Sequence, residues 1–593
     1  MSAPLTAGAS APAAPPVPAP DALEDELLTR VLSALLREDA YRLRSGAVPE
    51  TRPDGDWLRL PVAGEPLLLP VGPDGFQCEV RAREPLLLTP GGPVRGLRPA
   101  LARLRGAAAP EDRAGFDAFL AECDEALAAM RLHGRVRQDV LARLTAAHGP
   151  APAGWTGPRG SLAFDTLAAF REHPVYPTGH ARAGLTETEL RAYAPEFHPS
   201  FALRWLALPR GAVTGDRSAL PPWWPTPAAL GLPRLDATHL ALPVHPLTAG
   251  APLAAALAAT GLTGTARLAE RPWLEATPTL STRTVAVTGD PATHLKLPLV
   301  TATLGRRNRR TITPGSLVDG AAGQRLLEAI IAAEPRFAGA VLLADERTHL
   351  AAGHELLTAM VRRHPAGLHR SHVVTVAGLL APAPDGRPVA DILAERYYGG
   401  SLPALIDAYL TLLLDWHTTL FSYGTALESH QQNTSLVLDE TGGRTRMRLL
   451  LKDNDSPRVH PARLAARLGG RAAGLLGFDD RRILVGGDGP VADVFATITV
   501  HLCAGALAFE LARLGRGTPR EWLRLLRDRL TGALDRLAPG PAAVLRSRIL
   551  DADRLPVKAM ITAGTLLTKE RSGAADINKH YVDGPNYLRG AAG

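Results

Sequence analysis

A dense polar segment, Glu428-Ser-His-Gln-Gln-Asn433, leads directly into the apolar run Thr434-Ser-Leu-Val-Leu438. It places a carboxylate, an imidazole and three amides within six consecutive residues. Turns favour Gly, Asp, Ser and Asn, and polar groups at this density are costly to bury unless ligands or partners satisfy them. Ordinary turn-and-cap chemistry is the alternative. The composition of the segment predicts a ligand-binding site.

A second polar group, Lys452-Asp-Asn-Asp455, ends the next apolar run at 447–451. Its two carboxylates would lie at the tip of a strand, and such hard oxygen ligands suit a Mg²⁺ ion that bridges nucleotide phosphates. An exposed acidic turn is the alternative. Because a hairpin of the two apolar runs would bring Asp453 beside the segment 428–433, we expect a metal site there.

Cations and hydroxyls flank the strand-like run that contains Lys296. Ser281-Thr-Arg283 precedes this run, and Arg306-Arg-Asn-Arg-Arg310 follows it. Guanidinium groups bind phosphates and carboxylates through paired hydrogen bonds, so the group predicts an anion clamp. A solvated basic loop or a nucleic-acid patch is the alternative.

Two loops combine histidine with proline: Glu172-His-Pro-Val-Tyr-Pro-Thr-Gly-His-Ala-Arg182, and Leu242-Pro-Val-His-Pro246. Proline rigidifies the backbone and could orient His173 and Arg182 toward a cleft. In the sequence, His173 and His180 stand too far from other ligand types to predict a metal site. A single histidine of this kind is more often structural.

Lysine and asparagine are rare in this chain, which has five of each, although it contains 66 cations. All ten fall in four short segments: 296–308, 433–454, 558–569 and 578–586. Such a bias is typical of a GC-rich coding sequence, in which Arg replaces Lys wherever any cation serves. Lysine and arginine are not interchangeable at a phosphate or carboxylate, so the remaining lysines indicate functional positions in the second half. Chance, with a less biased second half, is the alternative.

The elements that must position these residues change along the chain. Residues 21–150 read as a mostly helical domain with a short strand-like insert near Trp57. Residues 151–390 alternate short apolar runs with Pro and Gly turns, which predicts a β-rich domain. From 391 to 593 helical patterns dominate, interrupted by the expected hairpin at 434–451.

Length and composition narrow the class of protein. At 593 residues with 46% hydrophobic content, the chain is typical of a globular protein with more than one core. The net charge of +7 comes from scattered cations, and 5% aromatic residues leave few platforms for base stacking, so we expect no nucleic-acid partner. No run approaches 18 apolar residues, so no membrane span is expected.

Cysteine usage and the N-terminal composition concern the compartment. Three distant cysteines, Cys78, Cys123 and Cys503, argue against a disulfide framework or a zinc site and favour the cytoplasm. Residues 1–20 are rich in Ala and Pro and carry no cation, which predicts a disordered tail rather than a signal peptide.

In their order along the chain, these segments resemble the IucA/IucC family, the siderophore synthetases that work without a nonribosomal peptide synthetase (NIS synthetases). The motifs that carry the resemblance are His173-Pro-Val-Tyr-Pro-Thr-Gly-His-Ala-Arg-Ala-Gly184, Tyr193-Ala-Pro-Glu-Phe197, Leu242-Pro-Val-His-Pro246, Ser281-Thr-Arg-Thr284, Lys296-Leu-Pro-Leu299, Arg310-Thr-Ile-Thr-Pro314, Glu428-Ser-His-Gln-Gln-Asn433, Lys452-Asp453 and Lys558-Ala559. Together they cover roughly residues 160 to 590.

Three positions depart from the family's pattern. Tyr176 and His180 replace a histidine and a lysine of the first motif, and Lys452 replaces an arginine. The family's Thr-x-x-x-Arg does not align in the stretch 304–309, where Thr303 is the candidate for the threonine. The resemblance implies an α+β cupped-hand fold with a helical thumb (21–150), β-rich fingers (151–390) and a helical palm (391–593), and a homodimer.

The resemblance also implies the reaction, which serves iron acquisition. A carboxylate of citrate or a related polycarboxylic acid attacks the α-phosphate of ATP, giving an acyl-adenylate and pyrophosphate, and an amine or hydroxyl then attacks the acyl carbon. Attack by one anion on another makes positioning and charge neutralisation the main tasks of the protein.

On this basis each candidate residue receives a role. The triphosphate is assigned to Ser281, Thr282, Arg283 and Lys296, and Mg²⁺ to Glu428 and Asp453. His430, Gln432 and Asn433 would line the junction between nucleotide and acid, and Thr303, Arg309 and Arg310 would bind the acid. The resemblance alone places His173 near the α-phosphate, and we expect His430, Lys296, His173 and Arg310 to be the catalytic group.

Two other classes of function remain open from the sequence. A kinase-like phosphotransferase would share ATP, Mg²⁺ and a Lys/Asp/Asn set, but the chain has no Gly-rich phosphate loop of the Walker or kinase type. A non-catalytic protein that binds polyanions or nucleic acid would bind in a strongly salt-dependent way and would not turn over ATP.

Overall fold

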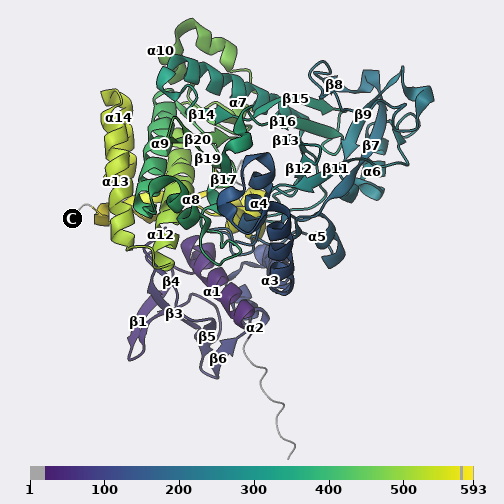
Figure 1. The fold of residues 1–593 in the computed structure, drawn as a ribbon. Coiled ribbons are helices and arrows are strands. Elements are labelled where there is room, and N and C mark those ends of the chain that lie inside the picture. The colour runs from purple at the N-terminus through teal and green to yellow at the C-terminus, as the bar shows by residue number, and fades with distance from the viewer. Residues whose placement is uncertain (1–20, 574–578, 592–593) are drawn as a thin grey trace, which may run out of the picture.

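The computed structural model describes residues 21–573 and 579–591, so the predicted tail at 1–20 lies outside the described residues. The described chain mixes helices with several sheets (Figure 1). The helices that precede the last third of the chain are α1 (Ala22–Arg37), α2 (Leu97–Leu104), α3 (Arg113–His148), α4 (Gly157–Ala169), α5 (Glu187–Tyr193), α6 (Ala251–Ala259), α7 (Pro314–Ala333) and α8 (Val389–Tyr398).

The N-terminal part combines α1, α2 and the long α3 with a sheet. Helix α1 begins after Asp21, whose side chain caps it by accepting a hydrogen bond from the Leu23 N–H. The strand-like insert predicted near Trp57 is, in the described residues, a six-stranded sheet of order β1-β2-β3-β5-β6 with β4 beside β3. Its strands are β1 (Val48–Arg52), β2 (Gly55–Arg59), β3 (Leu68–Pro73), β4 (Val80–Ala82), β5 (Leu86–Thr89) and β6 (Gly92–Arg95).

The predicted β-rich region contains a nine-stranded antiparallel sheet within the described part of the chain, of order β10-β7-β11-β12-β13-β16-β15-β8 with β9 beside β7. Its apolar side chains form a core that runs from Leu203 to Val361. The strands are β7 (Phe201–Pro209), β8 (Thr214–Gly215), β9 (His239–Val244), β10 (Arg267–Leu268), β11 (Trp273–Pro278), β12 (Thr284–Val287), β13 (Asp290–Lys296), β15 (Asp345–Ala351) and β16 (Thr358–Arg363).

The hairpin predicted at 434–451 is confirmed. Strands β19 (Thr434–Thr441) and β20 (Arg444–Leu451) pair antiparallel, with Thr434 opposite Leu451. They join β14 (Val341–Leu343) and β17 (His372–Thr375) in a sheet of order β14-β20-β19-β17. The register places the segment before β19 beside the segment after β20, because the Lys452 N–H donates to the Asn433 carbonyl at 3.1 Å.

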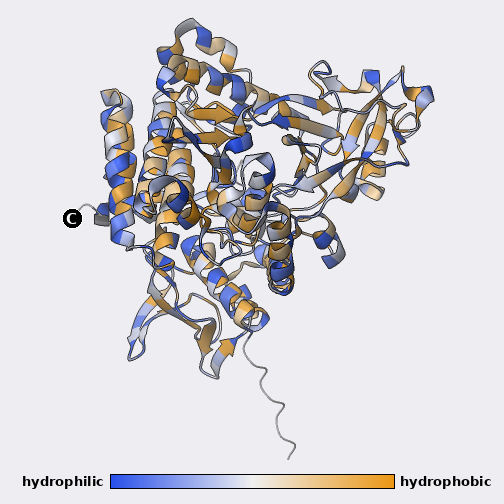
Figure 2. Cartoon of the chain, viewed as in Figure 1, coloured by the Kyte–Doolittle hydropathy of each residue, from blue (hydrophilic) through white to orange (hydrophobic). Residues whose placement is uncertain are grey.

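Helices dominate the last third, as predicted. They are α9 (Leu402–Ser422), α10 (Pro461–Leu468), α11 (Asp488–Val494), α12 (Ala506–Arg513), α13 (Pro519–Asp535), α14 (Pro539–Leu545) and α15 (Lys569–Ser572). Hydrophilic and hydrophobic residues alternate along α13, which packs one face on α9 (Figure 2). The helical stretch Asp488–Arg513 is long and apolar enough to cross a membrane, but 94% of its apolar 18-residue window is buried inside the protein.

The end of the chain returns to its beginning. Strands β22 (Arg554–Lys558) and β23 (Tyr581–Pro585) pair as a hairpin. The segment between them includes Ile561 and Leu566, which belong to the N-terminal core. The buried Glu38 carboxylate on the N-terminal side accepts the backbone N–H of Ile561 at 3.0 Å and that of Thr562 at 2.8 Å. The remaining short pair is β18 (Thr425–Ala426) with β21 (Arg458–Val459). These contacts pack the C-terminal segment against the N-terminal part of the chain.

Candidate active site

A cavity of about 1130 Å³ opens where the nine-stranded sheet, the β19–β20 hairpin and the C-terminal hairpin meet. The thirteen residues that received roles from the sequence come from six separate stretches of the chain, and the fold brings them to this one cavity. The lining includes His173, Ser281, Thr282, Arg283, Lys296, Thr303, Arg309, Arg310, Glu428, His430, Gln432, Asn433 and Asp453.

The polar segment 428–433 forms a tight turn before β19. The His430 N–H donates to the Glu428 carbonyl at 2.9 Å, and the Asn433 N–H donates to the His430 carbonyl at 2.8 Å. Two members of the segment contact the protein interior: the Ser429 hydroxyl lies 3.3 Å from His417 Nε2, and the Gln431 amide donates to the Leu502 carbonyl at 2.6 Å. Hydrogen bonds within the turn and to the interior therefore satisfy part of the polar groups of this segment, and the other polar side chains line the cavity.

Asp453 forms the first of two carboxylate centres in the cavity. Its Oδ1 bonds to Lys296 Nζ and lies 3.2 Å from Arg362 Nη2, while Asp455 Oδ2 lies 3.1 Å from the same Lys296 Nζ. Burial raises the pKa of Asp453, but Lys296, Arg362 and Arg283 outweigh it and hold that pKa well below its usual range. The carboxylate is therefore ionised at neutral pH.

The sheet itself builds this centre. Lys296 ends β13 and Arg362 lies on the neighbouring β16, where it stands opposite His294, so both cations rise from the same face. Glu346 on β15 pairs with Arg362 and accepts the Asp453 backbone N–H at 2.8 Å. Arg362 and Glu346 were missed in the sequence, because strand pairing rather than local pattern brings them here.

Glu428 forms the second centre. Lys558 Nζ lies 2.8 Å from Glu428 Oε2 and 3.2 Å from Oε1, and Lys579 Nζ lies 3.0 Å from Oε1. Burial raises the pKa of Glu428, but the two lysines outweigh it and hold the pKa far below its usual range. The lysine census indicated both cations, although it could not predict that they would meet this carboxylate.

Arg283 and Arg310 carry unbalanced positive charge at the cavity. Burial and the nearby Arg283 together lower the pKa of Arg310 to about 9, although the carboxylates of Asp453 and Asp455 act in the opposite direction. The buried Arg283 Nε has no hydrogen-bond partner among the described residues, although its Nη1 donates to the Thr311 carbonyl at 2.7 Å. Two adjacent guanidinium groups with an unused donor are suited to an anionic ligand.

The predicted clamp of four arginines at 306–310 is divided. Arg306 pairs with Glu125 at 3.1 Å, and Arg307 donates to the Ala563 carbonyl at 3.2 Å. Arg309 is largely exposed and pairs with Glu355 at 2.8 Å. Arg310, whose pKa burial lowers, lines the cavity, and each of the other three contacts a separate neighbour.

Burial keeps two histidines of the cavity, His173 and His430, in the neutral form at neutral pH. Burial lowers the pKa of His173 to about 3, and His430 contributes to the shift; burial likewise lowers the pKa of His430 to about 4. His173 Nδ1 accepts the Tyr176 N–H at 2.9 Å, which assigns the ring proton to Nε2. His173 therefore offers an N–H donor to an oxygen of a bound ligand.

Three residues of the cavity wall adopt the left-handed backbone region that side chains other than glycine rarely enter: Thr282 (φ 63°), Leu304 (φ 55°) and Asp453 (φ 62°). A β-branched threonine in this region is a true outlier. Such strain costs of order 1–3 kcal/mol and is concentrated at functional sites. The positions of these residues support the same cavity as the site of function.

The comparisons with known proteins begin with family models. Residues 162–381 match the family described as IucA / IucC, and residues 403–573 match the family described as ferric iron reductase FhuF-like transporter. The first match covers the loop of His173, both strands around Lys296 and the Arg306–Arg310 stretch. The second covers Glu428–Asn433 and Asp453.

Two curated relatives share shorter segments. The chain is 26% identical over 333 residues to the uncharacterized protein y4xN of Sinorhizobium fredii, covering 49% of this chain and 51% of the relative. It is 36% identical over 128 residues to the rhizobactin siderophore biosynthesis protein RhbC of Rhizobium meliloti, covering 19% of this chain and 21% of the relative. The matches thus span about half and about one fifth of these relatives' own lengths.

Solved structures match over nearly the whole chain. The petrobactin biosynthesis protein AsbB of Bacillus anthracis aligns with a TM-score of 0.72 at 15% identity, over 95% of this chain and 96% of that chain. ATP-bound aerobactin synthetase IucA of Klebsiella pneumoniae aligns with a TM-score of 0.69 at 17% identity, over 95% and 99%. The chain therefore has the α+β fold of the NIS siderophore synthetases, as predicted. The match of residues 162–381 to the IucA / IucC family confirms the resemblance for the motifs that lie in this range.

Proposed function

We propose that the chain is an ATP-dependent, AMP-forming ligase of siderophore biosynthesis, which adenylates a carboxylate of citrate or a related polycarboxylic acid and joins it to an amine or hydroxyl. The observation that carries this proposal is the convergence, on one cavity of about 1130 Å³, of the thirteen residues that received roles from the sequence. A volume of this order accommodates a nucleotide and a small acid together. The family match and the siderophore-related names of the relatives support the pathway.

The triphosphate is assigned to the end of the cavity that holds Ser281, Thr282, Arg283 and Lys296. Lys296 stands between Asp453 and Asp455, so a phosphate that approaches its ammonium group also approaches two carboxylates. A divalent cation between them would remove that repulsion, which is the charge neutralisation that Mg²⁺ supplies when it is bound. The donor set of two carboxylates therefore fits Mg²⁺.

The two predicted Mg²⁺ ligands fit unequally. Within the described chain, the ion pairs of Asp453 with Lys296 and Arg362 use Oδ1, whereas both oxygens of Glu428 are engaged by Lys558 and Lys579. We propose Asp453 as the principal ligand, with its neighbour Asp455. A role for Glu428 requires one of its lysines to move.

The acid is assigned to the centre of the cavity, where Arg310 and Arg283 combine with Thr303. Their guanidinium groups suit a polycarboxylate. Arg309 would act at the rim, since its side chain is exposed and already paired with Glu355. His430, Gln432 and Asn433 would contact the junction between the acid and the α-phosphate, and His173 would donate its Nε2–H to a phosphate oxygen as negative charge develops there.

The remaining proposals concern the setting of the enzyme. We place it in the cytoplasm, in agreement with three buried free cysteines, as a homodimer whose other partners are small molecules. The aerobactin synthetase IucA structure that this chain resembles is ATP-bound. The use of ATP by this chain is a proposal based on that similarity and on the cavity.

The test is a pyrophosphate-release assay with ATP and Mg²⁺ across a panel of polycarboxylic acids, followed by amines and hydroxyl compounds with the best acid. The ligase should release pyrophosphate and AMP in an acid-dependent way, and His430→Ala should remove that activity. Release of ADP would instead establish a phosphotransferase. Salt-sensitive DNA binding without ATP turnover would establish a binding protein.

A further inference from the structure

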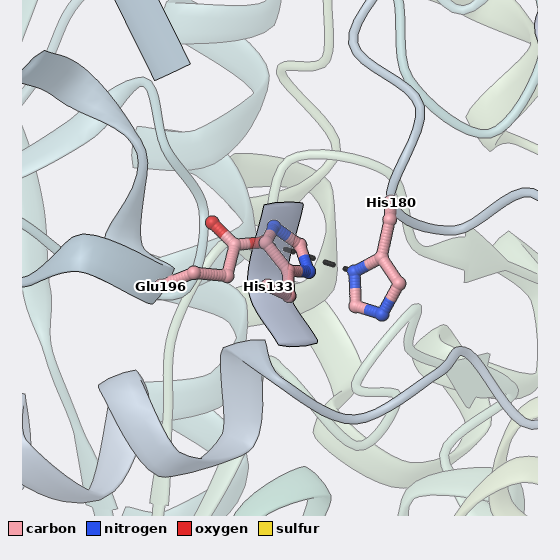
Figure 3. A group of neighbouring side chains, drawn as sticks. All are labelled: His133, His180 and Glu196. Carbon is pink, nitrogen blue, oxygen red and sulfur yellow. Dashed lines mark ion pairs between the residues drawn. The ribbon is translucent and has the colours of Figure 1, made fainter. Parts of the chain in front are cut away.

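Three buried ligand-type side chains form a cluster beside the cavity, and two of them, His180 and Glu196, line its wall; none of the three has been assigned a role in the reaction. His133 comes from α3, His180 from the loop after α4, and Glu196 from the turn that follows α5 (Figure 3). Their exposed fractions are 5%, 5% and 1%. One ligand atom from each side chain lies within 4.8 Å of the other two.

The spacing inside this cluster is wider than direct hydrogen bonding allows. His133 Nε2 lies 4.0 Å from Glu196 Oε1, and His180 Nδ1 lies 3.8 Å from the same oxygen. Nitrogen–oxygen hydrogen bonds measure about 2.7–3.2 Å. Because the three ligand atoms lie within 4.8 Å of one another, a point between them is roughly 2.3–2.5 Å from each, close to the about 2.0–2.2 Å of metal bonds to imidazole nitrogen and carboxylate oxygen.

His133 has no hydrogen-bond partner within the described part of the chain. Both of its ring nitrogens are buried and accept or donate no hydrogen bond there. Its ring is enclosed by Phe170, Phe197 and His180, with ring centres 5.7, 6.0 and 4.7 Å away. A buried polar group without a partner costs about 1–3 kcal/mol, so this imidazole points to a ligand that satisfies it.

The surroundings of His180 and Glu196 have the form that supports a metal ion. His180 Nε2 lies 3.1 Å from Glu172 Oε1, and Glu172 is fixed by Arg30 at 2.8 Å. Metal-bound histidines usually donate their second ring N–H to a carboxylate in this way. Arg182 fixes Glu196 through both oxygens at 2.7 and 3.0 Å. A carboxylate has lone pairs for a metal ion besides those used by one guanidinium.

We propose that His133, His180 and Glu196 bind one divalent first-row transition-metal ion, of the zinc or iron(II) class. Two imidazoles and one carboxylate suit these ions, whereas Mg²⁺ prefers oxygen ligands alone. Because His180 and Glu196 line the cavity, the ion has a route from solvent. It would join α3 to the loops that hold Arg182, whose Nε donates to Thr282 Oγ1 at 3.2 Å. This inference does not rest on the proposed function.

The test uses the untagged full chain, stripped with a chelator and dialysed against Zn²⁺ or, without oxygen, Fe²⁺, in the presence of excess Mg²⁺. Retained metal is measured by elemental analysis and the melting temperature by calorimetry. We expect one ion per chain and a higher melting temperature than for the stripped protein. His133→Leu should lose the ion and the shift, yet melt no lower than the wild type without metal, because it removes an unpaired polar group from an apolar site.

Two further variants separate the cluster from other histidines. Glu172→Gln keeps all three ligands but removes the carboxylate behind His180, so the affinity should fall about 10–100-fold. His364→Leu is the matched control, since both nitrogens of His364 also lack partners in the described chain but its charged neighbours are Lys452 and Arg362. It should retain the ion. Equal retention by His133→Leu and the wild type, or no retention by the wild type, would overturn the proposal.

Discussion

The Asp453 and Glu428 centres use the same chemistry but are built in different ways. Each is a carboxylate that stays ionised between two cations, although burial favours the neutral form. The cations of Asp453, Lys296 and Arg362, stand on neighbouring strands of one sheet. The cations of Glu428 lie far along the chain: Lys558 ends β22, and Lys579 comes shortly before β23. The first centre is thus built on one sheet, and the second depends on how the end of the chain packs at the cavity.

The strongest test of this contrast is Lys296→Met. The change removes the point charge proposed for the triphosphate and leaves Asp453 and Asp455 without the cation that they share. We expect acid-dependent pyrophosphate release to fall about 10²–10³-fold, as when a preorganised charge contact to the reacting group is lost. Lys569→Met is the matched control, because Lys569 is exposed on α15 and should retain full activity. Near-normal turnover by Lys296→Met would show that Lys296 has no role in the reaction.

The next test asks which centre holds Mg²⁺. Asp453→Asn keeps the shape of the side chain but removes the charge proposed for the ion, so turnover should fall roughly 10²-fold and the Mg²⁺ concentration for half-maximal rate should rise. Glu428→Gln should leave that Mg²⁺ requirement unchanged, because its oxygens serve Lys558 and Lys579. The measurement is pyrophosphate release against Mg²⁺ concentration. A raised requirement in Glu428→Gln alone would reverse the assignment.

A smaller effect should come from the closure of the second centre. In a double-mutant cycle with Glu428→Gln and Lys558→Met, we expect a coupling of about 1–3 kcal/mol, since the two groups touch and are largely buried. The measurement is the apparent free energy of unfolding of the C-terminal region in denaturant. Lys558→Met should also expose the β22–β23 hairpin to limited proteolysis sooner than Lys569→Met does. A coupling near zero would mean that the pair does not hold the hairpin.

The same contrast explains what could be predicted from the sequence. The alternation of apolar residues predicted the β19–β20 hairpin, and residue types that resist the Arg bias marked Lys296, Lys558 and Asn433. Local patterns specify such elements because they depend on neighbours in the chain. Which cation meets which carboxylate depends on tertiary packing, so the Glu428–Lys558 pair and the approach of His133 to His180 could not be predicted. The sheet at 48–95 was underestimated because its strands are short and interrupted by Gly and Pro.

The last test uses His430, which senses both centres. Burial holds its pKa at about 4, while Glu428 and, to a smaller extent, Asp453 raise it. Glu428→Gln should therefore lower the pKa of His430 more than Asp453→Asn does, which a titration of ¹³C-labelled histidine by NMR can measure, with His430→Asn to assign the signal.

The same shift sets the sign of a stability effect. The pKa of His430 is lower in the folded chain than the ordinary 6.5 of histidine, so between pH 6.5 and about 4 the unfolded chain binds more protons at this position. Stability should then fall as the pH falls through that window, and the fall should be shallower in His430→Asn. If the two carboxylate variants left the pKa of His430 unchanged, the histidine would lie outside the field of both centres. The difference between the Asp453 and Glu428 centres would then have no effect on the protonation of His430.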